Sequence, residues 1–130
     1  MFLEYRNTIK VEREYKGVIV YNDGSVFEGH FSADSINEKG RRVFASLDVY
    51  EGNYEEDEMC GSGYYLYANG ERFEGEWKNN QREGEGRLIV PGEGVWEGKW
   101  VNDKRHGTFT LTKDGVEIRK VEWNNGVALC

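Results

Sequence analysis

The amino-acid sequence repeats itself every 23 residues, and this period constrains the fold more than any other feature. An aromatic residue, Glu, Gly, a variable residue and a second aromatic residue recur at residues 27–31, 50–54, 73–77 and 96–100. The next position in the series, residues 119–123, keeps only the final Trp123. Of the 17 glycines, 13 fall in columns at this spacing, which glycines scattered through loops would not do. The thirteen are Gly17, Gly24, Gly29, Gly40, Gly52, Gly61, Gly63, Gly70, Gly75, Gly84, Gly86, Gly98 and Gly107. The chain is therefore an array of similar units.

Each unit has the pattern of a β-hairpin. Residues 71–78 alternate and carry aromatic side chains, as a strand does. Residues 79–84 are polar and end in glycine, which predicts a turn of several residues before a second strand at 86–90. Four or five such units predict an all-β fold, an elongated, twisted single antiparallel sheet of stacked hairpins. Nine or ten strands at about 4.8 Å each would give a sheet about 45 Å long.

Alternation along a strand places Phe73, Gly75 and Trp77 on one face of this sheet. The glycine leaves a gap in which a neighbouring ring can lie against the backbone. A single-layer sheet has no second layer to cover its aromatic face, and eight rings offer more apolar area than a monomer normally exposes. We therefore expect a protein partner, namely a peptide, a helix or a second copy of the chain, to cover this face. The candidate protein-binding residues are Phe27, Phe31, Tyr50, Tyr54, Phe73, Trp77, Trp96 and Trp100.

The opposite face of the same strands carries a glutamate in every copy of the motif. These residues are Glu28, Glu51, Glu74 and Glu97. Two interpretations stay open at this point, an acidic stripe that binds a basic partner and a solvated face that keeps the sheet soluble.

The charge and the cysteines limit the classes of partner and the compartment. A net charge of −7 argues against nucleic acid and against simple electrostatic docking to anionic lipid. Cys60 and Cys130 have no metal-ligand spacing and make no disulfide framework, which indicates free thiols in a reducing compartment. Without a signal peptide or an apolar run of membrane-spanning length, an intracellular, cytoplasmic protein is predicted.

The sequence offers no constellation typical of catalysis. Neither His30 nor His106 is paired with a second metal ligand, and the acidic run at 55–58 lacks the alternating ligands of a calcium loop. We therefore predict no enzymatic activity, no metal and no cofactor. Residues 103–106 form a short basic turn, in which Lys104 and Arg105 are the candidate contacts for an anion or a lipid head group.

The motif, followed by a polar turn, Gly-x-Gly and a short apolar strand, resembles the MORN (membrane occupation and recognition nexus) repeat. Residues 73–86 are the best copy, and the similarity extends over residues 16–126. The resemblance implies a scaffold or adaptor, with a cytoskeletal or membrane association through a partner. Two alternatives stay open, a phosphoinositide-binding or membrane-associating module and a regulatory subunit of an enzyme carried on another chain.

The terminal units depart from the repeat pattern. Glu38, Phe109 and Val121 stand at positions where the pattern has glycine. Terminal repeats are often atypical because they cap the open edges of the sheet. We therefore divide the chain into an N-terminal edge or capping segment, residues 1–15, and a repeat domain, residues 16–130, whose last unit is degenerate.

Overall fold

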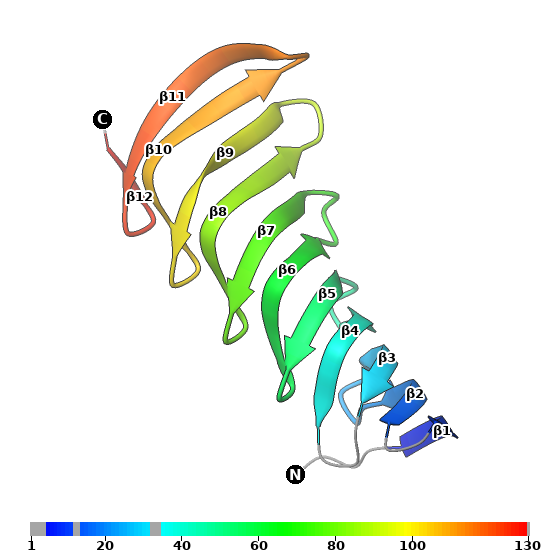
Figure 1. The fold of residues 1–130 in the computed structure, drawn as a ribbon. Helices are drawn as coiled ribbons and strands as arrows, with labels where there is room; N and C mark the ends of the chain where they lie inside the picture. Colours follow the sequence, from blue (N-terminus) through cyan, green and yellow to red (C-terminus); the bar gives the residue numbers. More distant parts are fainter. Residues whose placement is uncertain (1–4, 12–13, 32–34, 130) are drawn as a thin grey trace.

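The computed structural model, which describes residues 5–11, 14–31 and 35–129, is one open antiparallel sheet. Its twelve strands each pair with the next strand in sequence and form an elongated, twisted ribbon (Figure 1). The strands are β1 (Tyr5–Val11), β2 (Glu14–Val20), β3 (Val26–Phe31), β4 (Ile36–Val43), β5 (Val49–Glu55), β6 (Glu58–Leu66), β7 (Arg72–Lys78), β8 (Gln81–Val90), β9 (Gly94–Val101), β10 (Lys104–Lys113), β11 (Val116–Asn124) and β12 (Val127–Leu129). The predicted all-β single sheet of hairpins is confirmed, and the described residues contain no helix.

The sheet has more strands than the nine or ten expected, because pairing continues beyond the clear repeats. β1 pairs with β2 at one end, and the short β12 pairs with β11 at the other. At about 4.8 Å per strand the sheet is about 50 Å long. The division into residues 1–15 and 16–130 stays a prediction; β2 crosses it, and residues 1–4, 12–13 and 130 lie outside the described part of the chain.

The β5–β6, β7–β8 and β9–β10 hairpins turn within two residues, which is shorter than the sequence pattern indicated. Asn79 and Asn80 have φ angles of 48° and 66°, and Asn102 and Asp103 have 48° and 69°. Positive φ at both central residues is the mark of a type I′ turn, whose twist matches that of the strands it joins. The expected longer turns at 79–84 and 103–106 are therefore wrong, since Gln81 and Lys104 already begin the following strands.

Backbone hydrogen bonds from turn residues spaced 23 residues apart join each hairpin to the preceding one. In each contact the N–H of the second turn residue donates to the carbonyl oxygen of the residue 21 positions earlier. The pairs are Asp57 with Ile36 (2.9 Å), Asn80 with Met59 (3.2 Å), Asp103 with Arg82 (2.9 Å) and Gly126 with Arg105 (2.8 Å). In the first three pairs, a side-chain oxygen of the turn residue also accepts the backbone N–H of its partner, at 2.7, 2.8 and 3.2 Å. Glycine at position 126 cannot make this second bond.

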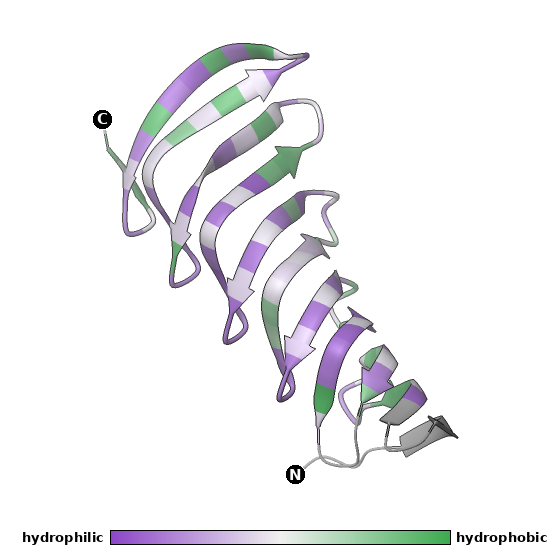
Figure 2. Cartoon of the chain, viewed as in Figure 1, coloured by the Kyte–Doolittle hydropathy of each residue, from purple (hydrophilic) through white to green (hydrophobic). Residues whose placement is uncertain are grey.

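The pairing register brings eight glycines into a single row across the sheet, from β2 to β9. Their order is Gly17, Gly29, Gly40, Gly52, Gly63, Gly75, Gly86 and Gly98. The strands are bent (Figure 1), and Figure 2 shows short apolar and polar bands alternating along them. The bend and the alternation create two different faces, the ring face, which carries the aromatic side chains, and the charged face opposite.

Candidate functional site

The ring face is the core of the protein. The eight aromatic side chains expected to bind a partner are exposed by no more than 6% in the chain alone. Phe27, Tyr50 and Phe73 are fully buried, and Trp77 and Trp96 are the most accessible of the eight at 6%. The expectation that these rings expose a large apolar area is therefore wrong. Their contact with a partner stays a prediction, but the exposed apolar area on which it was based is not present.

The rings bury one another by edge-to-face packing along the ribbon. Seven consecutive contacts, with ring centroids 5.3–6.4 Å apart, form one unbroken series across the strands. Its order is Phe27, Tyr54, Tyr50, Trp77, Phe73, Trp100, Phe109 and Trp123. Such pairs contribute about 0.5–1.5 kcal/mol each beyond the area they bury. A one-layer sheet can thus form a core without a second layer.

The glycine row allows the rings to pack this closely. A Cβ atom on Gly86 would lie 2.6 Å from a ring carbon of Phe73, on the neighbouring strand, as the sequence pattern predicted. The same ring also leans along its own strand, because a Cβ on Gly75 would lie 2.8 Å from its tip. Phe73 and Trp77 therefore converge over Gly75 until their centroids are 5.4 Å apart.

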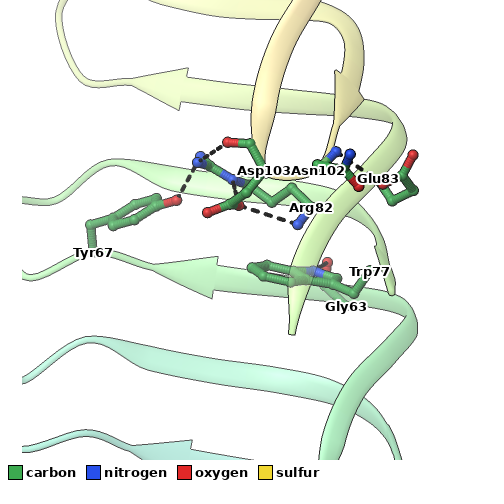
Figure 3. A network of polar contacts seen from close by, with 7 residues as sticks. All are labelled: Gly63, Tyr67, Trp77, Arg82, Glu83, Asn102 and Asp103. Atoms are coloured by element: carbon green, nitrogen blue, oxygen red, sulfur yellow. Dashed lines mark hydrogen bonds and ion pairs between the residues drawn. The ribbon is translucent and has the colours of Figure 1, made fainter. Parts of the chain in front are cut away.

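Two arginine side chains, one repeat apart, extend the ring face at one end of the strands. The guanidinium carbon of Arg82 lies 4.1 Å from the centroid of a Trp100 ring, and that of Arg105 lies 4.6 Å from a Trp123 ring. Figure 3 shows that Arg82 also points toward Asp103 and Tyr67, with Nε of Arg82 2.5 Å from Oδ1 of Asp103. Arg82 was not predicted from the sequence as a site residue. Its separation of 21 residues from Asp103, the same as that of Ile36 from Asp57, was the signal that could have indicated it. Of the predicted anion contacts, Lys104 and Arg105 line one cavity of about 520 Å³ with Trp123 and Gly126.

The charged face is not a continuous acidic stripe. Cross-strand pairing places Arg41 between Glu28 and Glu51, and Arg87 between Glu74 and Glu97. Nη1 of Arg87 lies 3.8 Å from Oε1 of Glu74. The acidic stripe is therefore wrong, because β4 and β8 contribute arginines to the same row as the glutamates.

A shallow open groove of about 770 Å³ crosses the charged face from β3 to β7. The backbone of the glycine row forms its floor, and the side chains of the residues on either side of each glycine form its walls. One wall includes Glu51, Tyr64 and Glu74, and the other includes Asn53 and Ser62. The wall side chains are held in place by hydrogen bonds, from the Tyr64 hydroxyl to Glu51 at 2.6 Å and from the Ser62 hydroxyl to Glu76 at 2.9 Å. The groove offers carboxylates, an amide and the basic side chains of Lys39 and Arg41 to a ligand.

Burial is the main influence on the pKa of several titratable groups on these surfaces. Burial is the main cause that raises the pKa of Tyr50, Tyr54 and Tyr65 far above the usual range, so the phenols stay protonated. Burial and the nearby Glu55 raise the pKa of the Cys60 thiol, which makes it a poor nucleophile. Within the described ranges, no cluster of His, Cys, Asp or Glu could hold a metal ion, and no helix is long and apolar enough to cross a membrane.

Comparison with known protein families matches residues 50–72, 73–91 and 96–108 to the MORN repeat. No curated protein matches the chain. The matched segments coincide with the hairpins whose rings and glycines build the core, and MORN repeats are generally non-catalytic. The chain therefore contains MORN repeats over residues 50–108.

Proposed function

We propose that this protein is a non-catalytic scaffold or adaptor that binds a protein partner on its charged face, in the groove above the glycine row. The observation that carries the proposal is the groove itself, which spans five strands and has the backbone of the glycine row as its floor. The rings of the ring face are buried in the core, so the opposite face is the broad surface left for a partner. An extended segment of another protein fits this groove better than a compact small molecule, because the groove is long, shallow and open.

The repeats offer a matched pair of positions for testing this surface. Ser62 and Thr108 are both exposed and lie 46 residues apart in the chain, and each donates a hydrogen bond to a glutamate on the next strand. Ser62 lines the groove, whereas Thr108 lies on β10, outside its lining. Arginine at either position has solvent to occupy and an acidic neighbour to pair with, so neither substitution should disturb the fold.

Peptides selected from a display library against the immobilised, folded chain should supply a probe. Their affinity should fall at least tenfold for Ser62→Arg, because the long side chain fills the groove, and should stay unchanged for Thr108→Arg. Selected peptides that bind both variants as tightly as the wild type would show that the groove is not the binding surface. Trp77→Ala and Trp100→Ala would not test this surface, since both rings are core residues whose loss would lower the free energy of unfolding by about 3–5 kcal/mol.

A further inference from the structure

Arg82 sits in a complete carboxylate-binding site that the protein makes from its own side chains. Its Nε lies 2.5 Å from Oδ1 of Asp103, and its Nη2 donates to the Asp103 backbone oxygen at 2.9 Å. Its Nη1 donates to the Tyr67 hydroxyl at 3.0 Å (Figure 3). The guanidinium carbon lies 4.1 Å from the centroid of a Trp100 ring. The carboxylate therefore comes from the turn of the following hairpin, and a flat ring supports the arginine from below.

Arg105 occupies the same place one repeat later, but the groups that complete the Arg82 site are missing. The position of Asp103 is taken by Gly126, and the position of Tyr67 is taken by Val90. The aromatic support is kept, because the Arg105 guanidinium lies 4.6 Å from a Trp123 ring and 5.5 Å from a Trp100 ring. Among the residues that the structure describes, none gives this guanidinium a hydrogen bond or an ion pair.

The surroundings of Arg105 favour an anion of modest charge. Burial is the main cause that lowers its pKa, and repulsion from the neighbouring Arg82 adds to the effect. The cavity beside it, about 520 Å³, also contains the side chains of Lys104 and Asn125. Glu71 and Glu93 line an adjoining cavity together with Arg105, and their negative charges raise the pKa of Arg105. These carboxylates would disfavour a doubly charged phosphate more than a single carboxylate.

We propose that Arg105, stacked on Trp123, binds an aspartate or glutamate side chain of a protein partner that docks at the C-terminal end of the sheet. The incoming carboxylate takes the place that Asp103 holds against Arg82 in the preceding repeat. Planar guanidinium groups bind carboxylates through two parallel hydrogen bonds, which gives direction as well as affinity. Val127, next to Gly126 in the chain, exposes 63% of its surface and supplies an apolar contact for the partner backbone. This site is separate from the groove, so the two proposals stand or fall independently.

A substitution at position 126 can supply a carboxylate to Arg105 from within the protein. Gly126 has a φ of +85°, close to the +69° at which Asp103 is held, and a Cβ there would meet the Lys104 side chain at an ordinary 3.5 Å. Gly126→Asp should therefore reproduce the Asp103 contact, occupy Arg105 and raise the melting temperature by a few degrees. Arg105→Gln removes the guanidinium instead and serves as the second variant.

The test is an NMR titration of the full chain with the peptide acetyl-Gly-Asp-Gly-amide, its Asn counterpart, inorganic phosphate and phosphoinositide-containing vesicles. We expect the Asp peptide to shift the Arg105 Nε–H and Trp123 indole signals saturably, with a dissociation constant on the order of 1 mM. The Asn peptide should leave them unchanged, and Gly126→Asp and Arg105→Gln should weaken the response at least tenfold. Equal shifts with both peptides, or an unchanged response in Gly126→Asp, would overturn the proposal. A response to phosphate or to the vesicles without one to the Asp peptide would overturn the assignment to a carboxylate.

Discussion

Tyr50 holds its phenol ring against Gly63 on the neighbouring strand so closely that no side chain fits at position 63. A Cβ atom there would lie 2.4 Å from the Tyr50 hydroxyl oxygen and 2.8 Å from two ring carbons. The same hydroxyl lies 2.5 Å from the place of a Cβ on Gly52, in its own strand. One ring thus requires glycine at two positions of the row, which explains why residues that usually weaken strands recur here.

Gly63→Ala should lower the free energy of unfolding by about 2 kcal/mol, since overpacking a well-packed core typically costs 1–3 kcal/mol. Urea denaturation measures the loss. On a Tyr50→Phe background the cost of Gly63→Ala should be smaller, because the nearest atom is gone. The same cost in both backgrounds would contradict the proposed clash.

Tyr50→Phe and Tyr54→Phe should differ, although both rings are buried in the same series. The Tyr50 hydroxyl donates to the Asn53 carbonyl oxygen at 2.9 Å, so its removal should cost about 1 kcal/mol. The Tyr54 hydroxyl is buried and has no hydrogen-bond partner in the described part of the chain, so its removal should be neutral or stabilising. Equilibrium unfolding of the two variants, compared with the wild type, tests this order, and an equal loss from both would refute it.

Asp103 should stabilise the protein mainly through the contacts of its turn with the preceding hairpin. Asp103→Gly places at position 103 the residue found at position 126. It should lower the free energy of unfolding by about 1–2 kcal/mol, because it removes the acceptor of the Arg82 N–H and the partner of the Arg82 guanidinium. Asp103→Asn should cost less, since Asn80 accepts the Met59 N–H in the same way. The ion pair itself is worth little, because 47% of the Asp103 side chain is exposed.

Asp114→Gly provides the control for this experiment. Asp114 also has a positive φ in a hairpin turn, but no hydrogen bond or ion pair of its side chain is found among the described residues. Its replacement should change the melting temperature little. A loss as large as that of Asp103→Gly would mean that turn conformation, and not the contact between hairpins, is responsible.

The protein should lose stability in alkaline solution. Burial raises the pKa of Tyr50, Tyr54 and Tyr65 in the folded state above the ordinary value of 10.0. Above about pH 10 the unfolded chain releases these protons while the folded chain retains them, so the unfolded state gains stability as the pH rises. Each tyrosine should contribute a fall of up to about 1.4 kcal/mol per pH unit in the free energy of unfolding.

Urea denaturation between pH 8 and pH 11, with tyrosinate absorbance recorded in parallel, measures this effect. Tyr50→Phe removes one titrating group and should make the fall less steep. Tyrosinate signals that appear near pH 10 in the folded protein, in proportion to all its tyrosines, would contradict the burial of these phenols.

Much of the architecture followed from the chain alone. The 23-residue period predicted the single antiparallel sheet, and alternation predicted that Phe73, Gly75 and Trp77 share a face. Turn lengths were less predictable, because Asn79 and Asn80 adopt positive φ and complete the turn before the polar segment ends. The arginine sites were missed, since Arg82 and Asp103 belong to different hairpins and meet only through the contact between successive turns.

The period and the alternation of rings with glycine were thus enough to predict that consecutive strands form hairpins and which face is apolar, because strand geometry is local and recurs with each repeat. Whether the apolar face is exposed was decided by the tertiary structure. Ring burial depends on how far each strand bends over its glycine and on how the rings of adjacent strands interlock. Those are non-local distances. The rings predicted to bind a partner are buried in the core, and the groove and the Arg105 cavity are left as the proposed surfaces for partners.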